Sequence, residues 1–407
     1  MAKTTKKDKP LNILILFLFI LLILFPLGQF TTIPLGIFGL VDIHIYLQDI
    51  VLIGIWFILI YLFSWDKIKL SQIPFFKPIL LFILMAFLSL IFNLSKLPFS
   101  QFIISSLYLI RWIGYLGVYF ASYLIILRQP QLKEKIYFGL IMAAFVSSIF
   151  GLLQYFLYPD LRNLYYLGWD PHYYRVFGTF LDPSFLGLIF VLALNLIYLQ
   201  IFTKPRSYWL MGIAGVIYIA LALTYSRSSY IAFALSMAFI CYQKRAWKYF
   251  FALIFIGLVT LKLLPNPTHS EGAHLGRSTS SEARIGSWQD SLSLIRKSPL
   301  FGLGFNALRY TNPTNTQYFA NNPIPSHASS GIENSFLFVW VTTGLIGLIS
   351  FVYLLGKIFI MGDEIVKVSL LAICLHSIFN NSLFYPWIMF WLWLILGLGL
   401  ARRVKKF

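Results

Sequence analysis

Repeated apolar runs of membrane-spanning length constrain this chain more than any other feature. Each run has about 18–25 residues with few charges, which suits a membrane-crossing α-helix rather than a barrel strand of about 10 residues. Only 11% of the 407 residues are charged, against about 25% in a soluble domain. The sequence therefore predicts an all-α polytopic membrane protein with about twelve transmembrane helices. The predicted spans are 11–27, 43–63, 78–94, 101–127, 136–158, 184–202, 207–224, 228–243, 247–264, 333–356, 365–381 and 384–401.

The basic residues between these runs predict the orientation of the chain. When the N-terminus is placed in the cytoplasm, most of the 32 lysines and arginines fall in short cytoplasmic clusters, as the positive-inside rule requires. The net charge of +18 thus reflects membrane orientation, and we expect no nucleic-acid partner. Both termini are predicted to be cytoplasmic. The first apolar run is interpreted as a retained helix, although its basic flank resembles that of a signal peptide.

One long polar segment separates the predicted spans. Residues 265–332 are expected to form a large extracytoplasmic loop within a single integral membrane domain, 1–407. The early part, Pro265–Ser281, is rich in Ser, Gly, Pro and His and is expected to be mobile. In Ser281–Lys297, apolar residues recur at three- and four-residue spacing, which predicts a short amphipathic helix within the loop.

Two arginines are the leading candidates for a binding site. Arg227 lies where one span ends and the next begins, on the predicted outer face. An arginine there is costly unless it faces a protein cavity or an anionic ligand, although snorkelling to lipid headgroups is the simpler alternative. Arg284 lies on the predicted loop helix, where it could be only a solvated charge. Two arginines facing one cavity favour a phosphate-bearing ligand, because guanidinium stays charged and binds phosphate bidentately.

A carboxylate opens the span that follows the loop. Glu333 is either a charge that complements the helix dipole or a general base able to deprotonate a sugar hydroxyl. Asn334 could support it by hydrogen bonding. His327 is an alternative base, because histidine titrates near neutrality.

Other polar residues near the spans have structural as well as functional interpretations. Arg175 is a candidate third phosphate or sugar contact, or else the partner of Asp182 or Asp170. Arg111 lies within a span and needs a partner, for which Asp49 is the obvious candidate. Interhelical hydrogen bonds are expected from three residues near the outer end of span 365–381: His376, Asn380 and Asn381.

Several common catalytic motifs are missing from the sequence. It contains no Walker loop, GxGxxG, HExxH or paired-cysteine metal motif. We therefore expect no cofactor, no metal site and no direct use of ATP. Chemistry on the outer face would need a pre-activated donor, such as a glycan on polyprenyl pyrophosphate, whose departing charge arginines could stabilise.

At this point the chain resembles the O-antigen ligase/polymerase family, most specifically over 175–350. The motifs keep one order and lie on one predicted membrane face. They are Arg175-Val-Phe-Gly-Thr-Phe180, Thr224-Tyr-Ser-Arg-Ser-Ser229, Arg284-Ile-Gly-Ser-Trp288, Ser298-Pro-Leu-Phe-Gly-Leu-Gly-Phe-Asn306, Glu333-Asn-Ser-Phe-Leu337 and Thr343-Gly-Leu-Ile-Gly347.

This resemblance implies a metal-independent, GT-C-like membrane glycosyltransferase in the bacterial cytoplasmic membrane. Such enzymes transfer an undecaprenyl-pyrophosphate-linked glycan to an acceptor glycan or lipid A-core. The two key arginines of the family correspond to Arg227 and Arg284. The family commonly has a catalytic histidine where this chain has Glu333, so a carboxylate base or a shift of the role to His327 is implied.

The sequence leaves ligase, polymerase and protein O-glycosyltransferase open, because they share this architecture. A glycolipid flippase or secondary transporter is the alternative from another class. A transporter would place functional charges near the bilayer midplane, in broken helices of two related halves. Here the charges lie at the predicted outer surface.

Overall fold

The computed structural model describes residues 9–34, 44–65, 70–167, 169–203, 208–267, 270–308 and 331–400. Each of the twelve predicted spans coincides with a helix. These are α1 (Lys9–Leu24), α2 (Leu47–Trp65), α3 (Phe76–Phe92), α4 (Phe99–Arg128), α5 (Leu132–Leu157), α6 (Pro183–Thr203), α7 (Tyr208–Ala222), α8 (Arg227–Lys244), α9 (Trp247–Leu263), α13 (Ser335–Met361), α14 (Glu364–His376) and α15 (Pro386–Leu400).

Six helices in the described part of the chain are long and apolar enough to cross a membrane. They are α1 with its 3-10 extension η1 (Phe25–Thr31), α2, α4, α5, α6 and α13. Shorter apolar helices include α3, α7 and α15. The chain is therefore a multi-pass helical membrane protein. The predicted loop helix is also present, as α10 (Thr279–Lys297).

A small hairpin departs from the all-helical expectation. β1 (Thr32–Pro34) pairs antiparallel with β2 (His44–Tyr46), so that Thr32 lies opposite Tyr46. Its β-branched and aromatic residues suit a strand. The hairpin brings the end of α1 and the start of α2 together beside α4 and α15.

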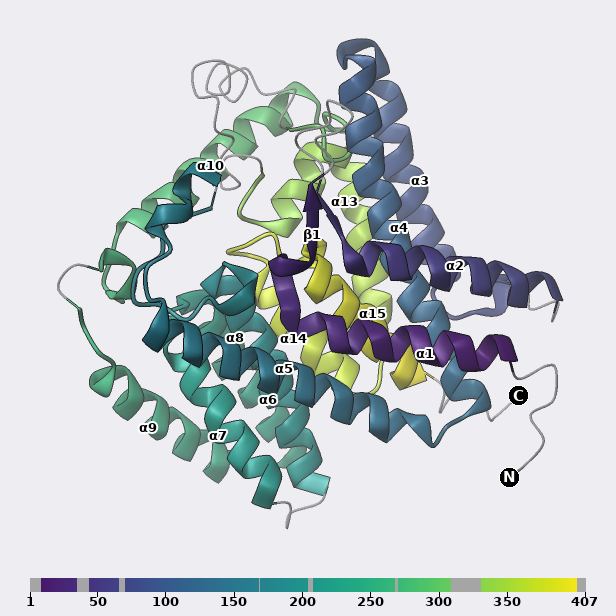
Figure 1. Ribbon diagram of the computed structural model, residues 1–407. Coiled ribbons are helices and arrows are strands. Elements are labelled where there is room, and N and C mark those ends of the chain that lie inside the picture. The colour runs from purple at the N-terminus through teal and green to yellow at the C-terminus, as the bar shows by residue number, and fades with distance from the viewer. Residues whose placement is uncertain are drawn as a thin grey trace.

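The last helix forms the centre of the molecule. Every residue of α15 is buried, as expected for a helix that is apolar on all sides. Figure 1 shows α15 in the middle, with α2 to α4 on one side and α7 to α9 on the other. At the edge, α9 has no buried residue. α10 packs against α13, across the molecule from α1.

Gly344 allows the segment after α10 to dock onto α13. Gly344 interrupts α13 with φ of 72° and ψ of −177°. At this interruption the Val341 carbonyl accepts a hydrogen bond from the Leu303 amide (2.9 Å), and the Leu345 amide donates to the Pro299 carbonyl (2.8 Å). A Cβ on Gly344 would lie 2.1 Å from the Leu300 carbonyl oxygen. Much of the Pro299–Gly304 and Thr343–Gly347 motif pair is thus structural, because it holds the end of α10 against α13.

Gly344→Ala should therefore destabilise the protein strongly. The residue needs a backbone conformation that is nearly exclusive to glycine, and its Cβ would overlap the Leu300 backbone, so we expect a cost of about 3 kcal/mol or more. The measurement is the apparent Tm of the purified protein in detergent. Gly356→Ala is the control on the same helix, because a Cβ there meets nothing within 4 Å. Equal Tm values for the two variants would contradict this packing.

Candidate functional site

The loop helix and the start of α13 meet through an ion pair. Arg284 Nε donates to Glu333 Oε2 at 3.1 Å, with 18% of the arginine side chain and 44% of the glutamate side chain exposed. The Arg284 guanidinium also lies 6.0 Å from the ring centre of Phe379. Burial raises the pKa of Glu333 above its ordinary value, and the charge of Arg284 opposes that shift. Two of the sequence-predicted site residues are thus in contact, although they are 49 positions apart.

Arg227 holds the segment that leads into the loop helix. Its Nη1 donates to the carbonyls of Leu275 (3.3 Å) and Arg277 (3.0 Å), and its Nη2 donates to Ser281 Oγ (3.0 Å). Ser226 caps α8 by accepting from the Ser229 amide at 3.4 Å, which places Arg227 in the first turn. Arg284 is close enough to Arg227 for their charges to repel.

Arg175 lies beneath this segment and is buried. Its Nε donates to the Thr224 carbonyl at 2.9 Å. Burial, with repulsion from the neighbouring Arg277, lowers the pKa of Arg175 to about 9. The negative charge of Asp182 raises the pKa of Arg175. Asp182 therefore attracts Arg175, whereas the hydrogen bond of Arg175 Nε goes to the Thr224 backbone carbonyl.

Sequence reasoning missed Arg277. Its Nη1 donates to the carbonyls of Gly272 (2.7 Å) and His274 (2.9 Å), and its Nη2 donates to that of Tyr225 (3.3 Å). The segment around it was expected to be mobile, but these contacts and a Ser270 hydrogen bond to the Tyr173 carbonyl tie it down. The missed signal was a single arginine in the polar stretch 265–281, whose other charged residue is Glu271. Four arginines, at positions 175, 227, 277 and 284, therefore form one basic cluster.

Two further carboxylates approach Glu333. Asp182 accepts from the backbone amides of Ser184 (2.6 Å) and Phe185 (3.1 Å) and so caps α6. Burial raises the pKa of Asp170 to about 6, helped by repulsion from Asp182 and Glu333. Burial also raises the pKa of Asp182. The site therefore combines basic residues on one side with three carboxyl groups on the other.

The remaining predicted residues have other positions. The side-chain oxygen of Asn334 caps α13 by accepting from the amides of Phe336 (2.9 Å) and Leu337 (3.0 Å), so in this structure it supports the helix that follows Glu333. His327 lies outside the described residues.

The predicted interhelical hydrogen bonds of His376 and Asn380 are confirmed. His376 Nε2 lies 3.1 Å from Ser228 Oγ, and its Nδ1 lies 2.7 Å from Ser382 Oγ. Asn380 Nδ2 donates to Ser228 Oγ at 3.0 Å. This network joins the first turn of α8 to the end of α14. α14 itself stops at His376, five positions before the predicted end, and the chain then turns through amide hydrogen bonds to the His376 carbonyl.

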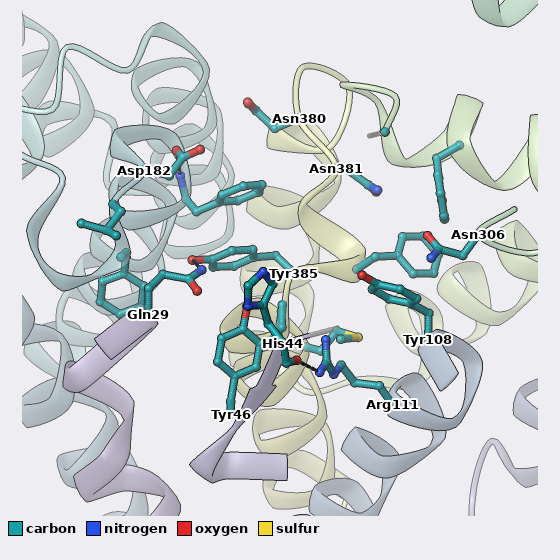
Figure 2. A pocket seen from close by; sticks show the side chains of 18 of the residues that line it. Gln29, His44, Tyr46, Tyr108, Arg111, Asp182, Asn306, Asn380, Asn381 and Tyr385 are labelled. Carbon is teal, nitrogen blue, oxygen red and sulfur yellow. Dashed lines mark hydrogen bonds between the residues drawn. The ribbon is translucent and has the colours of Figure 1, made fainter. Parts of the chain in front are cut away.

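A cavity of about 620 Å³ opens beside Glu333. Its walls come from η1, the hairpin, α4, the loop before α6, the start of α13 and the α14–α15 connection. Figure 2 shows polar side chains reaching into it from η1, the hairpin, α4, the loop before α6, the segment after α10 and the α14–α15 connection. The lining includes Gln29, His44, Tyr46, Tyr108, Arg111, Trp112, Trp169, Asp170, Asp182, Phe185, Asn306, Glu333, Asn380, Asn381 and Tyr385. Glu333 thus lies between this cavity and the basic cluster, whose four arginines are not among the described lining residues.

These features define a multi-pass membrane protein with a basic cluster and a carboxylate at the edge of an aromatic cavity. Residues 210–352 match the model of the O-antigen ligase family. That range contains Arg227, Arg277, Arg284 and Glu333. The match confirms the resemblance to the O-antigen ligase family that the motifs indicated.

Two curated relatives agree with that assignment. A general O-oligosaccharyltransferase of Acinetobacter baylyi is 25% identical over 238 residues, which cover 51% of this chain and 39% of the relative. A protein of Rickettsia bellii described as a polysaccharide ligase is 24% identical over 255 residues, which cover 60% of this chain and 58% of the relative. The matched regions thus span between two fifths and three fifths of the length of these relatives.

Proposed function

We propose that this chain transfers a glycan from a polyprenyl pyrophosphate donor to a sugar hydroxyl at the outer face of a bacterial cytoplasmic membrane. The observation that supports this most is the Arg284–Glu333 contact at the mouth of the cavity. It brings a cation suited to pyrophosphate next to a carboxylate suited to proton abstraction. The family match and the names of the two relatives support the same reaction class.

In the proposed reaction, Glu333 takes the proton of the acceptor hydroxyl. The acceptor oxygen forms a bond to the anomeric carbon of the donor glycan. The bond from that carbon to the pyrophosphate oxygen breaks, and its electron pair leaves with the pyrophosphate. Attack from the face opposite the leaving group inverts the anomeric centre. A raised pKa suits Glu333 to this role, because a stronger base accepts the proton more readily.

The basic cluster would neutralise the departing pyrophosphate. The charges of Arg284 and Arg227 repel each other, and an anion between them would relieve that repulsion. Arg175 and Arg277 add positive charge from beneath. Arg227 has a second role in this proposal, because its hydrogen bonds to 275–281 fix the segment that leads to Arg284. Guanidinium groups remain charged at neutral pH, so the reaction should need no metal.

The test is transfer by the purified protein. We would incubate it with an undecaprenyl-pyrophosphate oligosaccharide and measure free undecaprenyl pyrophosphate and the glycan product, with and without a lipid A-core acceptor. Undecaprenyl pyrophosphate should be released at the same rate with and without EDTA. Growth of the glycan alone would identify a polymerase, and transfer only to the core a ligase. No release with either acceptor, together with movement of the intact glycolipid across a vesicle bilayer, would replace this proposal with a flippase.

A further inference from the structure

The cavity beside Glu333 has a different chemical character from the basic cluster. It holds a single lysine or arginine among its described lining residues, Arg111. That charge is already balanced, because Arg111 Nη2 lies 2.9 Å from Asp49 Oδ2 and also donates to the His44 carbonyl. The predicted Arg111–Asp49 pair is thereby confirmed. Asp170, Asp182 and Glu333 also line the cavity, so its described lining carries more acidic than basic side chains.

This charge pattern argues against an anion inside the cavity. A phosphate or a carboxylated sugar would meet Asp170 and Asp182, a Glu333 that Arg284 pairs with, and a cation that Asp49 already neutralises. Like charges at close range are costly. An uncharged ligand meets no such penalty. The volume of about 620 Å³ lies within the range of small-molecule pockets, roughly 300–1,000 Å³.

The lining also offers flat aromatic surfaces. Tyr46 and Tyr108 flank Arg111, with ring centres 5.2 and 5.7 Å from its guanidinium carbon. Tyr385 stacks on Phe185, with ring centres 4.0 Å apart and planes 5° from parallel. All four rings line the cavity and are only partly buried. The C–H face of a pyranose packs on such rings, because their electron-rich faces attract its polarised hydrogens.

Polar groups between the rings complete the match. The side-chain oxygen of Asn381 is buried at the cavity wall and has no hydrogen-bond partner among the described residues. Such atoms are rare in folded proteins and call for a partner. Gln29 donates to the Tyr385 hydroxyl over 3.4 Å, a long hydrogen bond. In Figure 2, Asn381 from the α14–α15 connection and Asn306 from the segment after α10 extend toward the same space. Sugar hydroxyls both donate and accept, so they suit this mixed set.

We propose that the cavity beside Glu333 is a subsite for an uncharged pyranose of the acceptor glycan. The residues that would contact this sugar are Gln29, Tyr46, Tyr108, Asn381 and Tyr385. This subsite excludes acidic sugars. Its designation as the acceptor side rests on the proposed function, because Glu333 would then stand between the acceptor hydroxyl and the donor pyrophosphate. None of the five residues lies in the region matched by the family model, 210–352.

The test measures sugar binding without donor and without turnover. Saturation-transfer difference NMR on the full chain in detergent would use two matched pairs of probes. These are the methyl glycosides of glucose and glucuronic acid, and of galactose and galacturonic acid, whose members differ at C6. At least one neutral glycoside should show saturable binding to the protein. The corresponding uronide should bind at least about tenfold more weakly, a difference of about 1.4 kcal/mol. Equal or tighter binding of the uronides would overturn the proposal.

Two variants locate the effect. Tyr108→Ala removes one stacking face and should weaken the neutral glycoside about fivefold, whereas Tyr165→Ala, at an exposed aromatic outside the cavity, should not. Asp49→Asn keeps an acceptor for the Tyr46 amide but leaves the Arg111 charge unbalanced, so it should strengthen uronide binding. If neither Tyr108→Ala nor Asp49→Asn changed sugar binding, the proposal would be overturned. Sugar binding that follows this pattern in a protein that releases no undecaprenyl pyrophosphate would retain the subsite and reject the transferase function.

Discussion

Arg284→Ala should reduce the rate of undecaprenyl pyrophosphate release by about 100- to 1,000-fold, the usual loss when one preorganised charge-stabilising group is removed. Arg284 contacts Glu333 directly and lies beside Arg227, so its loss removes positive charge where the leaving group forms. The assay is single-turnover release at saturating donor. Saturation separates the chemical step from weaker donor binding.

Two controls accompany this variant. Arg296→Ala removes an exposed arginine from the same helix and should leave release unchanged. Arg284→Lys keeps a charge but loses the planar guanidinium, so it should retain only part of the activity. An Arg284→Ala protein that keeps wild-type release and elutes as a folded species would move the leaving-group site to Arg227, Arg277 and Arg175.

The helical framework is largely predictable from the sequence. Each of the twelve predicted apolar runs overlaps a helix, and six of these helices are long and apolar enough to cross a membrane. The pair of Arg111 and Asp49 was also predictable, because an intramembrane charge needs an opposite charge nearby. The hairpin and the early end of α14 could not be predicted. Strand pairing between β1 and β2 forms the hairpin, and hydrogen bonds of a local turn end α14 at His376.

The candidate site divides along the same line. Membrane sidedness alone indicated that Arg284 and Glu333 should face the same compartment, and they meet at 3.1 Å. Arg277 escaped notice because its position depends on backbone carbonyls, which carry no sequence signal. Asn334 was expected to support Glu333 by hydrogen bonding. Its side-chain oxygen instead accepts hydrogen bonds from the backbone amides of the first turn of α13. The residues that line the cavity lie in segments far apart in sequence, and the packing of helices such as α4 against α15 brings them together.

Glu333→Gln should lower transfer by about 100- to 10,000-fold, the range expected for loss of a general base. Glutamine is nearly the same size and still accepts a hydrogen bond from Arg284, so the fold should hold while the proton acceptor is lost. Glu282→Gln, a glutamate in the first turn of α10, is the matched control and should remain active. The readout is product formation at saturating donor and acceptor. Full activity in Glu333→Gln would assign the base to another residue, with His327 the first to test.

The pH profile provides an independent test of the same carboxylate. The active form of Glu333 is ionised, so transfer should fall as the pH drops through a pKa that burial holds above that of an ordinary glutamate. The negative charge of Asp182 contributes to raising that pKa. Asp182→Asn retains the α6 cap but removes the charge, so the acidic limb should move to lower pH. Asp160→Asn, at an exposed carboxylate paired with Arg162, should not move it. An acidic limb that stays in place in Asp182→Asn would show that the group titrating there is not Glu333.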